Sequence, residues 1–156
     1  MIKILFVCHG NICRSPMAEF IMKNLVAKHN LSDEFYIESC ATSTEEIWNG
    51  IGNPIYPPAR AELERNNIPF DKNKRARLIT KSDYDKFDLL ICMDSRNLRN
   101  IKGYIPNDPE NKIKKLMEFA GSSADVADPW FYGNFDVTFE DITRGCNALL
   151  DSLISY

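Results

Sequence analysis

The sequence predicts an α/β domain built around a mainly parallel β-sheet. Strand-like and helix-like segments alternate along the chain, which is typical of βαβ units. The first strand-like segment, Ile2 to Cys8, is almost continuously apolar, as expected for a parallel strand that is buried on both faces. A length of 156 residues, with 44% hydrophobic and 26% charged residues, fits a single globular domain over residues 1–156.

The first half of the chain should alternate between regular segments and one long loop. A Ser-Pro helix-start signal, followed by apolar residues at helical spacing, predicts a helix over residues 15–28. Alternating apolar and polar residues predict a second strand over residues 35–41. The stretch 42–58 is rich in Thr, Gly, Asn and Pro, so we expect a loop there, followed by a helix over residues 58–66.

The second half of the chain continues the same alternation. The expected segments are a short helix at 82–87, a buried strand at 89–93, a helix at 95–102, a strand at 113–119, a loop at 122–134 and a terminal helix whose apolar stripe runs from Phe139 to Leu153. Residues 113–119 also fit a helix, and the βαβ rhythm favours the strand. The Leu-rich stripe of the terminal helix indicates core packing.

Charge and hydropathy limit which partners the protein can bind and in which compartment it is expected. A formal net charge of −3 provides no basic field for nucleic acid or an anionic membrane. The longest apolar stretch is far shorter than the ~20 residues needed to cross a bilayer, and no secretory signal pattern is present. We therefore expect a cytoplasmic protein that binds neither nucleic acid nor membranes.

The cysteines are five in number and scattered, unlike the dense, even set of a small secreted scaffold. Neither a Cys-x-x-Cys pair nor a ligand-spaced His accompanies them, so we expect no metal site and no cofactor. Cys40, Cys92 and Cys146 are expected in the core, where free cysteines usually lie. Cys8 and Cys13 share one short segment and require a separate interpretation.

The segment from Cys8 to Ser15 joins the first strand to the first helix and predicts an anion-binding loop. Backbone N–H groups converge in such a loop, and the helix N-terminus adds the positive end of its dipole. Gly10 should allow a positive φ, and Asn11 is a side chain that tolerates the left-handed region. Arg14 can bind two phosphate oxygens with its planar guanidinium, and Cys8 should lie at the floor of the loop.

The expected surroundings of Cys8 favour the thiolate and predict a nucleophile that attacks phosphorus. Ser15 can donate its hydroxyl to the sulfur, cap the helix, or do both. Cys-x5-Arg spacing alone is a weak signal, but its place between a strand and a helix makes it specific. The nucleotide-binding pattern Gly-x4-Gly-Lys-Ser/Thr is absent, which argues against a nucleotide hydrolase. The alternative is a tight turn with a buried thiol, which would not need an arginine directed at the sulfur.

Cleavage of a phosphate ester also needs a proton donor for the departing oxygen, and Asp128 is the candidate. Pro129 stiffens its loop, and the aromatic residues that follow lower the local polarity. The alternative role of Asp128 is a turn residue or a helix cap. These aromatic residues indicate a deep slot, which phosphotyrosine can fill and phosphoserine is too short to fill.

The loop from Cys8 to Ser15, taken with Asp128-Pro129-Trp130, resembles the low-molecular-weight protein tyrosine phosphatases. The resemblance runs through nearly the whole chain and includes these further segments: Ala41-Thr42-Ser43, Ile79-Thr80 before Asp83, and Cys92-Met93-Asp94. It implies a three-layer α/β fold, with a four-stranded parallel sheet in the order 2-1-3-4 and helices on both faces. The catalytic loop would then lie at the carboxyl edge of the sheet, near its switch point.

The resemblance also implies the reaction and the residue roles. Phosphotyrosine in proteins, or a small aryl phosphate, would be hydrolysed through a phosphocysteine on Cys8, with inorganic phosphate as product. Asp128 would act first as acid and then as base, and Arg14 would replace a metal as the carrier of phosphate charge. The phosphate-binding residues would be His9, Gly10, Asn11, Ile12, Cys13, Arg14 and Ser15. The cleft would be lined by Trp130, Phe131 and, as a candidate that also fits simple packing, Trp48.

Two loop residues carry secondary expectations. The resemblance implies that Cys13 can close a reversible disulfide with Cys8 and so protect it from over-oxidation. The alternative for Cys13 is a small packing residue. His9 is expected to point outward and to tune the rim of the site.

The sequence departs from the family's pattern in three places. The stretch 44–52 is longer than the usual loop of the family, so the substrate specificity of the family does not carry over to this part of the chain. Trp-Phe-Tyr follows Asp128-Pro129 where many members carry two tyrosines, so regulation through those tyrosines does not transfer. Some relatives place a His near Lys74 to brace the loop Asn, so here Ser43 becomes a candidate support for Asn11.

Three other functions fit part of this pattern. An arsenate reductase would need further cysteines a few residues apart, and Cys92 has none between Met93 and Phe119. A phosphocarrier would need no general acid and would protect its phosphocysteine from water. A phosphotyrosine-binding module without activity would have lost the nucleophile, the arginine or the acid, and the sequence retains all three.

Overall fold

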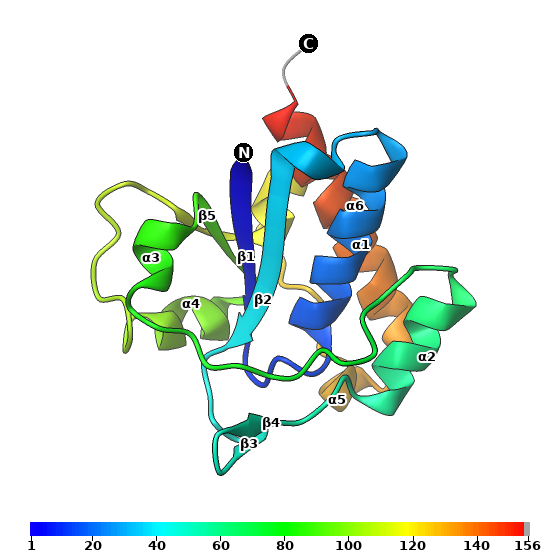
Figure 1. The fold of residues 1–156 in the computed structure, drawn as a ribbon, viewed down its shortest axis with the longest axis horizontal. Coiled ribbons are helices and arrows are strands. Elements are labelled where there is room, and N and C mark those ends of the chain that lie inside the picture. The colour runs from blue at the N-terminus through cyan, green and yellow to red at the C-terminus, as the bar shows by residue number, and fades with distance from the viewer. Residues whose placement is uncertain (155–156) are drawn as a thin grey trace.

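The computed structural model describes residues 1–154, without the side chains of Phe131 and Tyr132, and has three layers around a four-stranded parallel sheet (Figure 1). The sheet order is β2-β1-β5-β6. The strands are β1 Ile2–Cys8, β2 Phe35–Ala41, β5 Leu89–Cys92 and β6 Ile113–Lys115. Numbered within this sheet alone, the order is 2-1-3-4, which confirms the predicted fold class.

The register of β1 determines where the loops meet. Cys8 pairs with Ala41 on one side, and Val7 pairs with Cys92 on the other, both in parallel ladders. The three strands therefore end at one edge of the sheet, and the loops that leave them lie together there. The chain leaves β1 toward β2 on one side and returns to β5 on the other, which makes this edge the switch point where open α/β sheets bind ligands.

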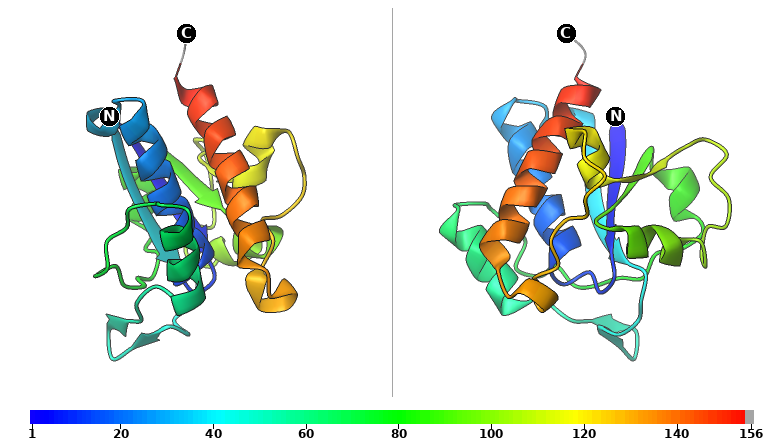
Figure 2. Two further views of the ribbon diagram at one scale, coloured as in Figure 1. Left: turned by 90° about the vertical axis from the view of Figure 1, so that its right-hand side faces the viewer. Right: turned by 180° about the vertical axis from the view of Figure 1, so that it is seen from behind.

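Helices cover both faces of the sheet, as Figures 1 and 2 show. One face carries α1 Arg14–Lys28, α2 Pro57–Arg65 and α6 Phe135–Leu153, and the other carries α3 Asp83–Lys86 and α4 Ser95–Ile101. Side chains of β1 alternate between these layers: Ile4 and Phe6 pack in the α1–α6 core, and Leu5 and Val7 in the core under α3 and α4. None of the helices in the described part of the chain is long and apolar enough to cross a membrane.

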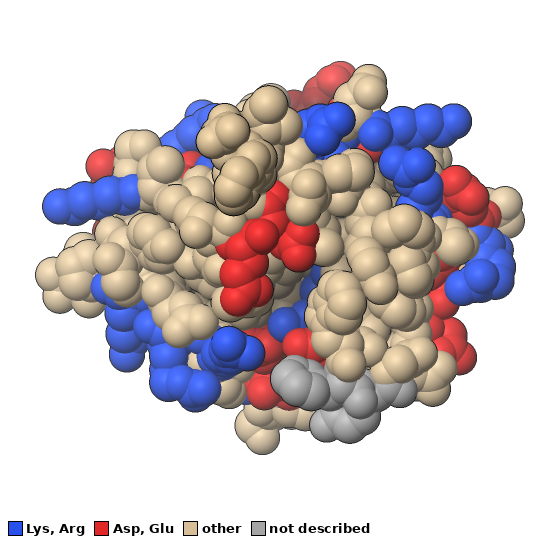
Figure 3. All heavy atoms as spheres, turned by 90° about the horizontal axis from the view of Figure 1, so that it is seen from below, with Lys and Arg blue, Asp and Glu red and all other residues tan. Residues whose placement is uncertain are grey.

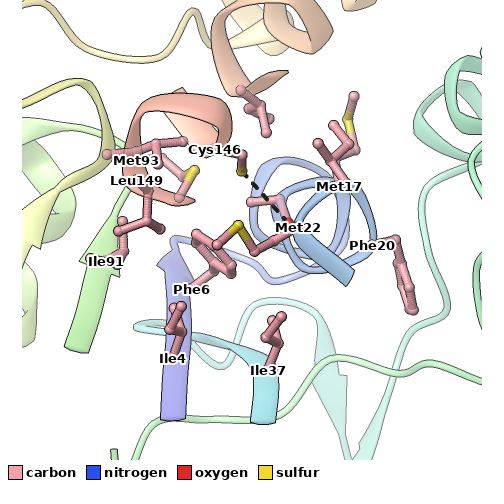
Figure 4. Close-up of a cluster of buried hydrophobic side chains, with 14 of the residues drawn as sticks. Ile4, Phe6, Met17, Phe20, Met22, Ile37, Ile91, Met93, Cys146 and Leu149 are labelled. Carbon is pink, nitrogen blue, oxygen red and sulfur yellow. Dashed lines mark hydrogen bonds between the residues drawn. The ribbon is translucent and has the colours of Figure 1, made fainter. Parts of the chain in front are cut away.

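The larger core lies between the sheet and the α1–α6 pair. Figure 4 shows Phe6 of β1, Met22 of α1, and Cys146 and Leu149 of α6 converging there, and all four are fully buried. Burial of each large apolar side chain contributes about 1.5–3 kcal/mol. The predicted apolar stripe of the terminal helix is therefore core, as expected.

Gly145 of α6 provides a test of this packing. A Cβ atom at Gly145 would lie 2.5 Å from Leu116 Cγ, so α6 can approach the segment 116–120 this closely only without a side chain here. We expect Gly145→Ala to lower the free energy of unfolding by about 1–3 kcal/mol, despite the better helix propensity of Ala. Urea unfolding measures this, and Gly103→Ala, whose Cβ would meet nothing closer than 3.4 Å, is the control. Equal stabilities of the two variants would contradict the packing argument.

The predicted loop 42–58 is wrong in its centre, where two short strands form an antiparallel hairpin: β3 Ile47–Trp48 and β4 Ile51–Gly52. Asn49 and Gly50 form its turn with φ of 50° and 76°. Such an Asn-Gly pair favours a two-residue hairpin because both residues accept positive φ. That local signal was present in the sequence, although the overall composition indicated a loop.

Two other expected segments differ from the structure, and one short element lies where none was predicted. The strand predicted at 113–119 ends at Lys115 and continues as a 3-10 helix, η2 Leu116–Ala120. The predicted loop 122–134 contains one helical turn, α5 Pro129–Tyr132. A further 3-10 turn, η1 Ser32–Glu34, precedes β2. Tertiary packing, which local apolar spacing does not report, determines where such short elements end.

Candidate active site

A cavity of about 1400 Å³ opens at the carboxyl edge of the sheet. The loop from Cys8 to Arg14 forms its floor. Glu45 and Glu46 border one side, and the start of α4 and the segment 125–128 border others. The residues predicted for the anion-binding loop thus lie at one large hollow, which Figure 3 shows at the centre of this face.

The Cys8 sulfur lies at the base of this cavity and receives hydrogen bonds. The residue is 4% exposed, and its Sγ lies 2.9 Å from Ser15 Oγ and 3.3 Å from the Asn11 backbone N–H, which donates to it. Such donors stabilise negative charge on sulfur. Ser15 therefore faces the sulfur; helix α1 begins at Arg14 and has no side-chain cap, so the predicted capping role of Ser15 is wrong.

The other cysteines have no such environment. Burial raises the pKa of the Cys13 thiol well above its usual range, and the nearby Cys8 sulfur raises it further. Burial likewise raises the pKa of the thiols of Cys40, Cys92 and Cys146. These four remain protonated at neutral pH, which leaves Cys8 as the candidate nucleophile.

Asn11 shapes the loop, and its side chain is held on three sides. Its φ of 59° confirms the expected left-handed conformation. Its Oδ1 accepts from the backbone N–H of Arg77 at 3.1 Å, so its Nδ2 must face the opposite way. That Nδ2 donates to Ser15 Oγ at 2.8 Å and to Ser39 Oγ at 3.0 Å. The hydroxyl proton of Ser15 can then be donated to the sulfur, at 2.9 Å, or to the Cys40 carbonyl, at 3.4 Å.

A buried carboxylate sets the direction of these hydrogen bonds. The Ser39 hydroxyl donates to Glu19 Oε1 at 2.6 Å, so its oxygen accepts only from Asn11. Glu19 is 4% exposed and is balanced by Lys23 at 2.6 Å and Lys74 at 3.5 Å. From Glu19 to Ser15 the hydrogen bonds thereby have one direction, and the Cys8 sulfur, at 2.9 Å, is a nearer acceptor for the Ser15 hydroxyl than the Cys40 carbonyl at 3.4 Å.

Ser39, and not the predicted Ser43, supports Asn11. Ser43 Oγ instead accepts the backbone N–H of Glu45. We expect Ser39→Ala to lower kcat about tenfold, because the loop loses the contact that positions Asn11 and Ser15. Ser43→Ala, the matched control, should retain nearly full kcat. Initial rates on an aryl phosphate measure both, and an equal loss in the two variants would remove Ser39 from the network.

Arg14 closes the loop above the sulfur. Its Nη2 lies 2.8 Å from Asp94 Oδ2, and its Nη1 donates to the Val126 carbonyl at 3.2 Å. Burial opposes its charge, but the Cys8 sulfur and the Asp94 and Asp128 carboxylates outweigh it and raise the pKa of Arg14. In the sequence, Asp94 was noted only as part of the segment Cys92-Met93-Asp94 that resembles the family, without a role. The signal that could have indicated a role is its position directly after a buried strand, at the switch-point edge of the sheet.

Asp128 lies at the mouth of the cavity, with Oδ2 3.6 Å from Arg14 Nη2. Its Oδ1 accepts the Trp130 backbone N–H at 3.0 Å, so it also caps α5, which was the alternative role. The residue before Asp128 is held by two hydrogen bonds to α6. Ala127 donates its N–H to Asp141 and accepts from Thr138, each within 3.0 Å. The carboxyl is thus placed at the mouth before any substrate arrives.

The predicted aromatic walls are only partly found. Trp130 borders the cavity, and its ring leans on Tyr56 with centroids 4.5 Å apart. Trp48 does not border the cavity: it lies on the β3–β4 hairpin with 79% of its surface exposed, and Glu45 and Glu46 take the expected place. The side chain of Phe131 lies outside the described residues, so its predicted role stays a prediction.

The remaining loop residues can also be placed. Gly10 does not have the expected positive φ; instead, a Cβ there would lie 3.1 Å from Glu46 Cγ, so glycine allows the rim to approach the loop. Ile12 and Cys13 are buried and border the cavity. His9 lies at the rim, with Nε2 2.9 Å from Glu45 Oε2. Within residues 1–154, no three His, Cys, Asp or Glu side chains gather to hold a metal ion.

Phosphate esters are the anions that a thiolate in this setting can attack, and the fold and site together define a cysteine-based phosphatase. The chain belongs to the low molecular weight phosphotyrosine protein phosphatase family, whose model matches residues 3–155. The resemblance stated from the loop motif is thereby confirmed.

Individual relatives support this assignment over the full length. The chain is 39% identical to the low molecular weight protein-tyrosine-phosphatase YfkJ of Bacillus subtilis, over 98% of this chain and 96% of the relative. The YfkJ crystal structure superposes with a TM-score of 0.90, at 38% identity, and covers 98% and 94% of the two chains. The structure of the phosphatase SP-PTP from Streptococcus pyogenes gives 0.87 at 41% identity, covering 99% and 95%. That of the drosophila arginine phosphatase DARP gives 0.84 at 30% identity, covering 99% of each chain.

Proposed function

We propose that this protein hydrolyses phosphotyrosine in proteins, and small aryl phosphates, through a phosphocysteine intermediate. The observation that carries the proposal is the Cys8 sulfur, which accepts the Asn11 N–H and lies 2.9 Å from Ser15 Oγ at the floor of a cavity that Arg14 and Asp128 border. Phosphate is a tetrahedral dianion, and this arrangement offers it a nucleophile, a cation and a proton donor at once.

In the first step, the Cys8 sulfur attacks phosphorus and the bond from phosphorus to the tyrosine oxygen breaks. Asp128 gives its proton to that oxygen, and Arg14 with the loop N–H groups binds the equatorial oxygens. In the second step, water attacks the phosphocysteine, Asp128 takes a proton from the water, and the thiolate leaves. Ser15, 2.9 Å from the sulfur, stabilises its charge before attack and on departure.

The three alternative functions fit the site less well. An acid held at the mouth of the cavity favours hydrolysis over a carrier, which gains nothing from it. A reductase that relays a disulfide needs accessible thiols, and Cys92 and Cys146 are fully buried. A binding module would not need the buried chain from Glu19 to Cys8, which holds the Ser15 hydroxyl beside the nucleophile.

The deciding experiment is hydrolysis of para-nitrophenyl phosphate in EDTA, followed by matched phosphotyrosine, phosphoserine and phosphoarginine peptides. We expect turnover in EDTA and a clear preference for phosphotyrosine, because its ring spans the depth from the mouth to the buried sulfur. Phosphoarginine is included because a similar structure is that of an arginine phosphatase. A preference for phosphoarginine or phosphoserine would overturn the proposed substrate.

We also propose that Cys13 protects Cys8 from irreversible oxidation, as the resemblance implied. Peroxide converts the Cys8 thiolate to a sulfenic acid; the Cys13 sulfur then attacks it, water leaves, and a disulfide forms. Activity lost to peroxide should return with dithiothreitol in the wild type and fail to return in Cys13→Ala. Cys146→Ala, a buried thiol in the α1–α6 core, is the control. Full recovery in Cys13→Ala would assign Cys13 to packing alone.

We propose further that residues 1–156 form one phosphatase domain and that the protein works in the cytoplasm. The four-stranded sheet with helices on both faces supports the first proposal. The five scattered cysteines, unlike the dense and even set of a small secreted scaffold, support the second.

A further inference from the structure

The rim of the cavity carries opposite charges on its two sides. Glu45 and Glu46, which we call the acidic rim, follow β2, while Arg96 and Arg99, the basic rim, lie on α4. Figure 3 views this face: acidic groups border the central hollow, and a cluster of basic groups lies beside it. A peptide whose phosphotyrosine fills the cavity must pass its neighbouring residues over this rim.

The charges of the basic rim are available to a ligand. Arg96 and Arg99 are exposed, and no carboxylate of the described residues forms an ion pair with either. Asp94 and Asp125 lie on the same side, but Asp94 is paired with Arg14, and Asp125 with Lys115 at 2.8 Å. The free charge on this side is therefore positive.

The acidic rim is held in place yet remains open to solvent. Glu46 accepts from Asn53 at 2.7 Å, and Glu45 is oriented by its N–H bond to Ser43 and by His9. The Glu45 side chain is nevertheless 68% exposed, so a cation can reach it.

We infer that this protein selects phosphotyrosine segments by charge order, with an acidic residue on the α4 side of the phosphotyrosine and a basic residue on the Glu45–Glu46 side. The inference rests on the proposed function and adds the sequence context of its substrate. A single exposed ion pair contributes little to binding. The two peptide orders differ more, because the matching order makes two favourable contacts where the reversed order makes two repulsive ones. We expect about a tenfold difference in kcat/KM between the two orders.

The test uses two phosphotyrosine peptides of identical composition: one with acidic residues before and basic residues after the phosphotyrosine, and one with the reverse. Net charge is then equal, so general attraction cancels. One order should be preferred about tenfold, less so at high salt. The variant Glu45→Lys, Glu46→Lys, Arg96→Glu, Arg99→Glu should prefer the other order. Because the readout is a ratio within one enzyme, a general loss of activity in the variant does not affect it.

Two results would overturn the inference: equal kcat/KM for the two peptides, or an unchanged preference in the charge-reversed variant. Turnover of para-nitrophenyl phosphate, which has no flanking residues, separates these from failure of the proposed function. If the wild type hydrolyses neither peptide, both the proposed function and this inference are wrong. If it hydrolyses both equally, only the charge-order inference fails.

Discussion

Replacement of Cys8 by serine should abolish turnover while the loop keeps its shape and still binds phosphate. Serine is nearly isosteric, so its hydroxyl can occupy the same place beside Ser15 and the Asn11 N–H. A hydroxyl is far harder to ionise than a thiol, and no base lies beside it in this cluster to remove its proton. We expect kcat to fall by a factor of about 10⁴ or more.

The measurement combines steady-state rates with binding of a phosphotyrosine peptide by calorimetry. Peptide affinity should stay close to the wild-type KM value, because Arg14 and the backbone N–H groups are retained. Cys146→Ala, which removes a buried thiol distant from the loop, should keep its activity. Residual turnover within tenfold of wild type in Cys8→Ser would remove Cys8 as the nucleophile.

The second large effect is expected from Asp128→Asn, and its size should depend on the leaving group. The amide still accepts the Trp130 N–H and so keeps the cap of α5, but it has no proton to give. Phosphotyrosine leaves as a strongly basic phenolate, so its hydrolysis should slow by roughly 100- to 1000-fold. Para-nitrophenolate is a weaker base that leaves without help, and its ester should be affected much less.

The ratio of the two rates is the diagnostic measurement. Asp136→Asn, an exposed carboxylate in the first turn of α6, serves as the control and should change neither rate. An equal loss on both substrates would indicate that Asp128 positions Arg14, 3.6 Å away, and does not donate a proton.

Much of the architecture was readable from contiguous segments. The strands Ile2–Cys8 and Phe35–Ala41 match their predicted bounds, because each is a continuous run whose side-chain pattern reports its own burial. The anion-binding loop was readable for a similar reason: its thiol, amides, arginine and helix N-terminus are neighbours along the chain. The Asn49-Gly50 turn shows that a local signal can still be masked by the composition around it.

Contacts between distant segments could not be read in this way. Ser39 meets Asn11, and Glu19 meets Ser39, only because β2 and α1 flank the loop, and another serine, Ser43, lies a few residues away. The Asp94 contact with Arg14 and the departure of Trp48 from the cavity likewise depend on how separate loops lie at the sheet edge.

The sequence by itself therefore determined the fold class, the family and the chemical identity of the loop, since these depend on patterns within short stretches of chain. Only the tertiary structure decided which residues hold Ser15 beside Cys8, which carboxylate holds Arg14, and which charges border the cavity. The physical reason is that hydrogen bonds and ion pairs require their atoms within a few ångströms, and the distance between residues far apart in sequence is determined only once the sheet and helices have packed.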